Sequence, residues 1–372
     1  MGDSTIGMNN QEWLSSILRR FKLNPLQATL MMAVLHLVVD VPMWFLFRET
    51  IAAKELAIQP SDVVYELLVH PMILGYFCWF QGVGNRLFSE LTQRRIISSE
   101  SHLQNVIAGS SKWLQSKWVG RVALAITLLS VCWIVLAFAP LPGLQLYPEA
   151  PYPSWITAHP AIVWSQVPGL VIVVYALLLT VYDVVIIIIA LYAAFRNQEI
   201  RVEPLNPDKA GGLGFIGRFS ANLCYLIGAI GLLQSVRAVQ AQADLTEPRN
   251  YMFVAGLVLY LLLAPILFFI PLWTSHAAMK RYRDRLLADV SKRFDAVLAR
   301  VHSLRQEGDK GAEALLDEMQ QLDEMRTLIA KQTPVWPFNV GSVSKFFGLV
   351  FSPILPAVTS YVEDYITNLL GR

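Results

Sequence analysis

The sequence has long stretches with almost no charge. Between Arg121 and Arg196 it contains no lysine or arginine, and its charged residues there are Glu149 and Asp183. Only 16% of the 372 residues are charged, 55% are hydrophobic, and the mean hydropathy is +0.46. A soluble globular protein of this length carries more charge and fewer apolar residues. The scarcity of charge argues against an ordinary soluble enzyme and indicates a membrane protein.

Cysteines and catalytic motifs are also scarce. Cys78, Cys132 and Cys224 all fall in apolar stretches, so neither a disulfide framework nor a thiolate metal site is expected. The sequence contains no His-Glu-x-x-His, Gly-x-Ser-x-Gly, Cys-x-x-Cys or phosphate-loop motif. Its 30 basic and 28 acidic residues give a net charge of +2, which indicates no nucleic-acid partner. These absences favour a non-enzymatic function without a cofactor.

The chain is instead rich in apolar runs of spanning length. A helix of about 20 apolar residues crosses the ~30 Å hydrocarbon core of a bilayer. The runs predict an all-α, polytopic transmembrane helix bundle with six spans, at Asn24–Phe47, Glu66–Glu90, Trp118–Leu141, Val167–Phe195, Gly214–Ser235 and Tyr251–Ser275.

Basic residues alternate between the connections. They occur before the first predicted span, in the second and fourth connections and after the sixth span, at Arg19, Arg20, Lys22, Arg94, Arg95, Lys112, Lys117, Arg196, Arg201, Lys209, Lys280, Arg281, Arg283 and Arg285. The opposite connections contain no basic residue in Pro140–Gln166 and only Arg249 in Ala238–Asn250. The positive-inside rule therefore predicts a cytoplasmic N-terminus and a cytoplasmic end after the sixth span.

A second region follows the six-helix domain, which occupies residues 1–275. Apolar residues recur at spacings of three and four between 287 and 304 and again between 315 and 329, and Glu307–Gly311 separates the two stripes. This pattern predicts a cytoplasmic, coiled-coil-like helical hairpin at residues 276–333. Such a hairpin favours an assembly stalk and a homo-oligomer; the alternative is a lever that couples the cytoplasm to the bundle.

The last region, residues 334–372, is predicted to associate with the membrane. Phe346–Val362 is uncharged, but Pro353 and Pro356 interrupt it and its length is marginal for a span. A short seventh span, a re-entrant segment and a helix in the interface are all compatible with this pattern.

Ionisable residues inside the spans are the best indications of function, because each costs at least ~2.5 kcal/mol at the bilayer centre. Asp183 lies near the middle of the fourth predicted span, and His36 and Asp40 lie one helical turn apart on the first. These residues are candidates for an ion pathway or a proton relay. The alternative is a structural ion pair between Asp40 and Arg237, with His36 hydrogen-bonded in the core.

A metal site is a further hypothesis for the same helix. His70, at the start of the second span, is predicted at a depth similar to that of His36 and Asp40. Three ligands on two helices would suit a catalytic metal with an open coordination position.

The most distinctive local sequence is Pro204–Phe215. It begins a Gly-x-Gly-x-x-Gly pattern, but no strand is predicted before it, which argues against dinucleotide binding. Amides at this helix start are candidates for holding a phosphate or a lipid headgroup, through Lys209, Gly211, Gly212, Gly214 and Arg218. The alternative is a tight turn into a helix with a small-residue packing face, made by Gly217, Ala221, Cys224, Gly228 and Ser235.

Two motifs, Pro204–Phe215 and Pro334–Phe338, resemble an uncharacterised family of bacterial multi-pass inner-membrane proteins. The resemblance implies a bacterial cytoplasmic membrane and no particular activity. The sequence as a whole predicts an oligomeric ion-conducting channel or sensor-gated pore. A non-catalytic membrane scaffold and a metal-dependent intramembrane enzyme are the alternatives. The expected partners are membrane lipids, ions and further copies of the chain.

Overall fold

The computed structural model is all-α. It describes residues 23–53, 60–138, 159–240, 248–307 and 312–355, apart from 205 and 339, and isolated residues outside these ranges. Its helices are α2 (Pro25–Ala53), α3 (Pro60–Val64), the π-helical turn η1 (Tyr65–Val69), α4 (His70–Phe80), α5 (Val83–Gln93), α6 (Glu100–Leu114), α7 (Lys117–Phe138), α8 (Pro160–Phe195), α9 (Gly214–Gln240), α10 (Pro248–Glu307), α11 (Ala312–Gln332), α12 (Val340–Phe351) and the 3-10 turn η3 (Ser352–Ile354).

The prediction of six membrane-spanning helices is confirmed. Six helical stretches are long and apolar enough to cross a bilayer, and they lie at Pro25–Ala52, Pro60–Gln93, Glu100–Leu136, Pro160–Phe195, Gly214–Arg237 and Gly256–Ser303. Many large apolar side chains on their outer faces are exposed, as on α2, where Leu30, Val34 and Val38 are each more than half exposed. Such faces suit lipid rather than water, so the chain is a multi-pass membrane protein.

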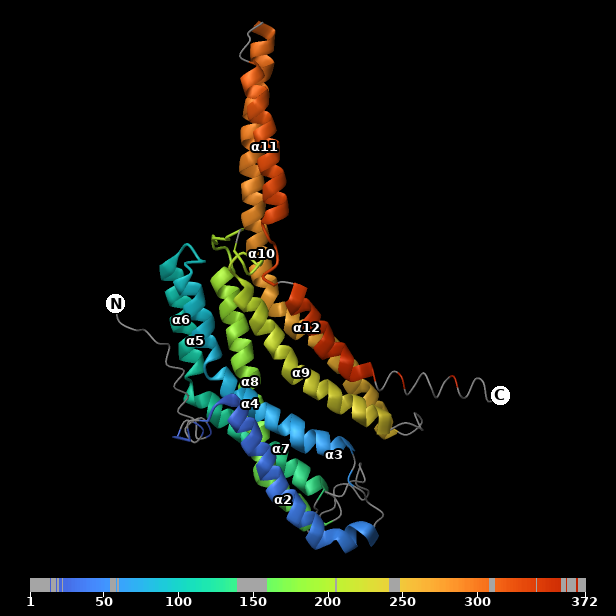
Figure 1. Ribbon diagram of the computed structural model, residues 1–372. Helices are drawn as coiled ribbons and strands as arrows, with labels where there is room; N and C mark the ends of the chain where they lie inside the picture. Colours follow the sequence, from blue (N-terminus) through green and yellow to red (C-terminus); the bar gives the residue numbers. More distant parts are fainter. Residues whose placement is uncertain are drawn as a thin grey trace.

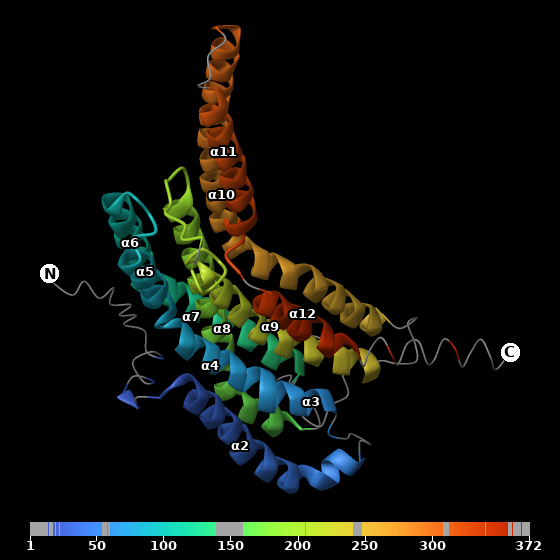
Figure 2. The ribbon, with the colours of Figure 1, turned by 45° about the horizontal axis from the view of Figure 1, so that its top comes forward.

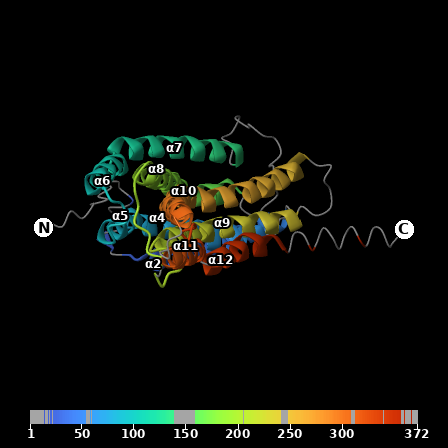
Figure 3. The same ribbon diagram turned by 90° about the horizontal axis from the view of Figure 1, so that it is seen from above.

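The spans form one bundle from which a long stalk projects (Figure 1). The element α4 lies inside the bundle, where it packs against α2, α8 and α9. Seen along the stalk, α7 lies on one side of α8 and α10, and α12 lies beside α9 on the other (Figure 3). The end of the bundle next to the stalk is called the stalk end below, and the opposite end the far end; the basic connections predict that the stalk end is cytoplasmic.

The stalk consists of the last part of α10 together with α11. The helix α10 has 60 residues and would be about 90 Å long if straight. It bends between its membrane part, which contains Pro265 and Pro271, and the stalk (Figure 2). Apolar side chains of both predicted stripes pack between the two stalk helices: Val290, Val297, Val301 and Leu322 are buried, and Phe294, Leu315, Met319 and Ile329 pack against them.

One helix that the sequence did not predict, α6, extends the bundle at the stalk end. The connection after the second predicted span forms the end of α5 and all of α6, and α6 runs antiparallel to the end of α8. The Tyr182 hydroxyl donates to the Trp113 carbonyl at 3.0 Å, and His102 Nε2 lies 3.0 Å from the Ala193 carbonyl. The exposed residues of α6 are mainly polar, whereas the part of α8 beside it also exposes Val185, Ile189 and Tyr192.

The described part of the C-terminal segment packs along α9 on the small-residue face that the sequence predicted. A Cβ atom on Gly217 would lie 2.5 Å from the Pro337 carbonyl oxygen, and one on Gly228 would lie 2.9 Å from that of Leu349. These contacts are eleven residues apart along α9, or roughly 16 Å. Residues 346–355 therefore pack along α9, so one face of this segment contacts protein. The remainder of the predicted segment, apart from Thr359, lies outside the described residues.

Candidate cation site

Two spans bring together a cluster of four ionisable side chains. His36 and Asp40 lie on α2, Glu66 lies on η1, and His70 begins α4. All four are buried, with exposed fractions between 4% and 9%. They lie toward the far end of the bundle, because His36 is eleven residues, or roughly 16 Å, along α2 from its start at Pro25.

Proline explains why the second span contains a π-helical turn at this place. The amide of His70 donates to the Tyr65 carbonyl, which is the i→i−5 bond of a π-helix. The next residue, Pro71, has no amide hydrogen, and its ring would collide with the Leu67 carbonyl in a regular α-helix. The widened turn re-aims the side chains that it contains. Turns of this kind are common at functional sites, and here the turn holds Glu66.

The cluster has the distances of a ligand set. Nitrogen or oxygen atoms of His36, Asp40 and Glu66 all lie within 4.8 Å of one another. His36 Nδ1 lies 3.8 Å from Asp40 Oδ2, and His36 Nε2 lies 3.2 Å from Nδ1 of His70. One nitrogen of His36 therefore faces the carboxylates, while the other is held by His70.

A third helix, α8, also contacts the cluster. Gln166 Nε2 donates to Asp40 Oδ1 at 2.5 Å and fixes the orientation of that carboxylate. One turn further, Gly169 brings the α8 backbone close to the imidazole, since a Cβ atom there would lie 3.4 Å from His36 Cε1. Neither Gln166 nor Gly169 was predicted as part of a site.

His70 contributes one nitrogen that has no partner among the described atoms. Its Nε2 is buried and makes no hydrogen bond there. The Tyr65 ring packs on the imidazole with a centroid separation of 3.9 Å, and the Arg237 guanidinium lies 5.6 Å from the Tyr65 ring centroid. Arg237 thus lies near the cluster, although its predicted ion pair with Asp40 stays a prediction.

A cavity of about 290 Å³ reaches the cluster between α2 and α3. Its ionisable lining residues are Asp40, Asp62 and Glu66. The other lining residues are large and apolar, namely Leu37, Val41, Trp44, Phe45, Ile58, Val63 and Leu67. Asp62 lies four residues before Glu66, toward the start of α3, so the carboxylates form a path from the far end into the cluster.

The residues present fit a divalent transition-metal ion. One imidazole and two carboxylates are ligands that Zn²⁺, Mn²⁺ or Fe²⁺ accept. A metal-bound histidine usually donates its other N–H to a neighbouring group, and Nδ1 of His70 lies within hydrogen-bond distance of Nε2 of His36. Tetrahedral ligand atoms at 2.0–2.2 Å from a metal are roughly 3.4 Å apart, so the widest pairs here would move together by up to about 1.4 Å.

The sequence hypothesis of a metal site named two of these three ligands. His36, Asp40 and Glu66 form the group whose ligand atoms lie within 4.8 Å of one another. His70 is outside this group and contacts Nε2 of His36. Glu66 was missed, although a carboxylate four residues before His70 in an apolar segment is an unusual feature that could have indicated it.

Asp183 lies apart from the cluster. It is buried, but it is seventeen residues, or roughly 25 Å, along α8 from Gln166. It directly follows Tyr182, which bonds to the end of α6, and so lies level with the start of α7. Its predicted role in an ion pathway stays a prediction.

In the glycine-rich loop before α9, an aspartate of the loop itself accepts hydrogen bonds from the loop amides. The Asp208 carboxylate accepts from the amides of Ala210, Gly212 and Gly214 at 2.8, 3.1 and 3.0 Å. Two of the amides predicted to hold a phosphate or headgroup therefore already have an anionic partner. That site stays a prediction, with exposed Lys209 and Arg218 as its available charged groups.

Comparisons with models of protein families, with curated protein sequences and with solved structures found no match. The case for a function therefore depends on the geometry of the cluster.

Proposed function

We propose that the protein translocates a divalent transition-metal ion across the membrane and that His36, Asp40 and Glu66 bind this ion. The observation behind the proposal is the group of ligand atoms within 4.8 Å, buried inside the bundle and reached by a mainly apolar cavity whose lining includes three carboxylates. Two adjacent buried carboxylates are costly unless a proton or a cation neutralises them. A bound metal ion would remove that cost.

Translocation, rather than storage, is favoured by the position of the site. The acidic path from Asp62 to Glu66 offers a route from the far end, and Asp183 provides a second buried carboxylate toward the stalk end. Intramembrane carboxylates at successive depths are typical of ion pathways. The proposal thus specifies the ion for the pore predicted from the sequence.

A metal-dependent intramembrane enzyme is the second candidate. It is favoured by the apolar walls of the cavity, which would accept a hydrocarbon chain next to the open coordination position. In that case the metal would supply a polarised water or carbonyl, and the protein would orient it through the Gln166–Asp40 and His70–His36 contacts.

The test combines metal binding with metal flux. Purified protein in lipid discs would be titrated with Zn²⁺, Mn²⁺ and Co²⁺ by calorimetry, and flux into reconstituted vesicles would be followed with an enclosed metal-sensitive dye. Asp40→Asn and Glu66→Gln should lower both affinity and flux, because each removes an anionic ligand of similar size. Asp183→Asn is the matched control: it should leave affinity unchanged and reduce only flux.

The outcomes separate the hypotheses. Binding that persists unchanged in Asp40→Asn and Glu66→Gln would refute the site. Binding that needs both carboxylates without any flux would refute translocation and favour the enzyme. Proton flux that requires Glu66 without metal binding would assign the cluster to a proton relay instead.

A further inference from the structure

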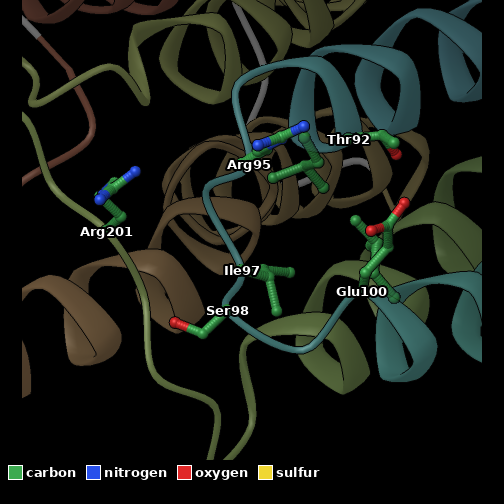
Figure 4. Close-up of a pocket in the computed structure, with 8 residues that line it drawn as sticks. Thr92, Arg95, Ile97, Ser98, Glu100 and Arg201 are labelled. Atoms are coloured by element: carbon green, nitrogen blue, oxygen red, sulfur yellow. The ribbon is translucent and has the colours of Figure 1, made fainter.

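A second pocket, with a more polar lining, lies at the stalk end of the bundle. It has a volume of about 450 Å³ and is lined by Leu91, Thr92, Arg95, Ile97, Ser98, Glu100, Leu103 and Arg201. The pocket lies between the α5–α6 connection and the segment that follows α8 (Figure 4). None of its residues belongs to the cation cluster.

Backbone hydrogen bonds hold the two sides of the pocket together. Ile97 and Ile200 form an antiparallel bridge, in which the Ser98 amide donates to the Glu199 carbonyl at 3.0 Å and the Arg201 amide donates to the Ile96 carbonyl at 2.7 Å. The bridge fixes the segment of Arg95 relative to that of Arg201. Two arginines on a rigid frame are well suited to bind a phosphate, because each guanidinium offers a fork of N–H donors.

The backbone at Arg95 is set by the end of α5. Its φ is +47°, the left-handed conformation in which helices commonly end, and the amides of Arg95 and Ile96 donate to the carbonyls of Thr92 and Leu91. This ending leads the chain out of α5 and places Arg95 in the lining of the pocket.

The charges around the pocket leave it positive. Neighbouring acidic groups have partners of their own, since Glu90 bonds to Arg94 and Glu199 to Arg285. Figure 4 shows Arg201 at the left, Glu100 at the right and Arg95 between them. A ligand that matches both sides has a phosphate at one end and an ammonium group at the other.

The surface of α6 favours a soluble ligand over a lipid headgroup. The pocket is at the first turn of α6, and the exposed side chains that follow on this helix, Ser101, Gln104 and Asn105, are polar. A lipid whose headgroup lay in the pocket would find no apolar surface for its acyl chains on this part of α6.

We propose that this pocket binds a small soluble molecule that contains both a phosphate and an amine, with Arg95 and Arg201 on the phosphate and Glu100 on the ammonium group. This site is separate from the proposed cation site and does not depend on it.

Calorimetry with the full-length protein in phosphatidylcholine discs would test the proposal, with phosphoethanolamine and inorganic phosphate as probes. Arg201→Gln and Arg95→Asn should each weaken phosphoethanolamine binding roughly tenfold or more, as the loss of one charge-assisted contact implies. Asparagine is chosen at position 95 because it tolerates positive φ. Arg86→Gln, on the exposed face of α5, is the matched control and should change nothing.

Glu100→Gln makes the test specific. It should weaken the binding of phosphoethanolamine but strengthen that of inorganic phosphate, because it removes the ammonium partner and a repulsive charge together. Equal affinity in all variants, or no binding of either probe, would overturn the proposal. If discs that contain phosphatidylethanolamine block the pocket in an Arg201-dependent way while soluble phosphoethanolamine does not bind, the ligand is a headgroup and the assignment of a soluble ligand is wrong.

Discussion

The substitution Gly75→Ala would test whether the approach of α2 to α4 sets the geometry of the cation site. Gly75 lies five residues, or roughly 7.5 Å, after His70 on α4. A Cβ atom there would lie 2.0 Å from Thr29 Oγ1 and 3.0 Å from the Pro25 carbonyl oxygen. Contacts of Cβ atoms below 3.0 Å essentially do not occur, so this pair must separate by about 1.0 Å, from 2.0 to 3.0 Å.

The effect of Gly75→Ala on the free energy of unfolding is the difference between two opposing effects. Overpacking between well-packed elements costs typically 1–3 kcal/mol, whereas replacing glycine by alanine in a helix gains up to about 1 kcal/mol. The loss of metal affinity should be larger than the loss of stability suggests, because α2 carries His36 and Asp40 while the second span carries Glu66. A larger separation of the two spans would add to the movement of up to about 1.4 Å that the ligands already need, so we expect affinity to fall roughly 10- to 100-fold, as when a supporting residue is lost.

The assay is calorimetric metal binding together with thermal unfolding, for Gly75→Ala, for Thr29→Ala and for the double variant. Thr29→Ala removes the nearest clashing atom, so the double variant should regain most of the affinity. Gly109→Ala is the control, since its Cβ would meet nothing within 4 Å and it should be neutral or stabilising. Unchanged affinity in Gly75→Ala, or no recovery in the double variant, would refute the argument that this contact positions the ligands.

Three further predictions concern other parts of the molecule. After replacement of the native cysteines, a cysteine at Gln145 should react with an impermeant thiol reagent from outside the cell and one at Ser111 should not; the opposite pattern would reverse the orientation. Gly228→Leu should displace the segment at Leu349 from α9, and a spin label at position 349 should then gain accessibility to oxygen, whereas equal accessibility in both proteins would show that this contact does not hold the segment. Leu322→Ala should destabilise the stalk by about 2–5 kcal/mol, measured by unfolding with a stalk-specific probe, and a change below about 0.5 kcal/mol would contradict the packing between α10 and α11.

The six spans could be predicted from the sequence because run length and hydropathy alone decide them. Not all of their ends could be predicted: α8 begins at Pro160, seven residues before the predicted start at Val167, and α10 continues to Glu307, where packing against α11 replaces lipid. The helix α6 was not predicted, because the prediction for the connection that contains it used only its basic residues. Its buried side chains at Leu103, Ile107, Ser110 and Leu114 follow spacings of four, three and four, a helical pattern that a search for periodicity would have found.

The candidate site was only partly predictable. His36 and Asp40 are close by helical spacing, so the sequence suffices for them. Their meeting with Glu66 depends on the crossing of two spans and on the π-helical turn before Pro71, and neither follows from hydropathy. For Asp183 the sequence gives the helix but not the depth, because the predicted span was assumed to begin and end with the membrane.

The cluster also has a consequence for the stability of α2, which is the least enclosed of the spans. Only 11% of its most apolar stretch is buried within the protein, so most of its surface would face lipid, and its main packing partner in the bundle is α4. Its ionisable residues His36 and Asp40 face inward against Glu66 and His70, which is unfavourable without a neutralising ion. A metal that binds only the assembled site stabilises it by RT ln(1 + [L]/Kd), or about 2.7 kcal/mol at 100 times Kd. We therefore expect a chelator to lower the unfolding temperature of the native protein and to expose α2 to proteolysis first. Glu66→Gln should already behave like the chelated protein and show no further change, and an equal effect of the chelator on both proteins would place the responsible metal elsewhere.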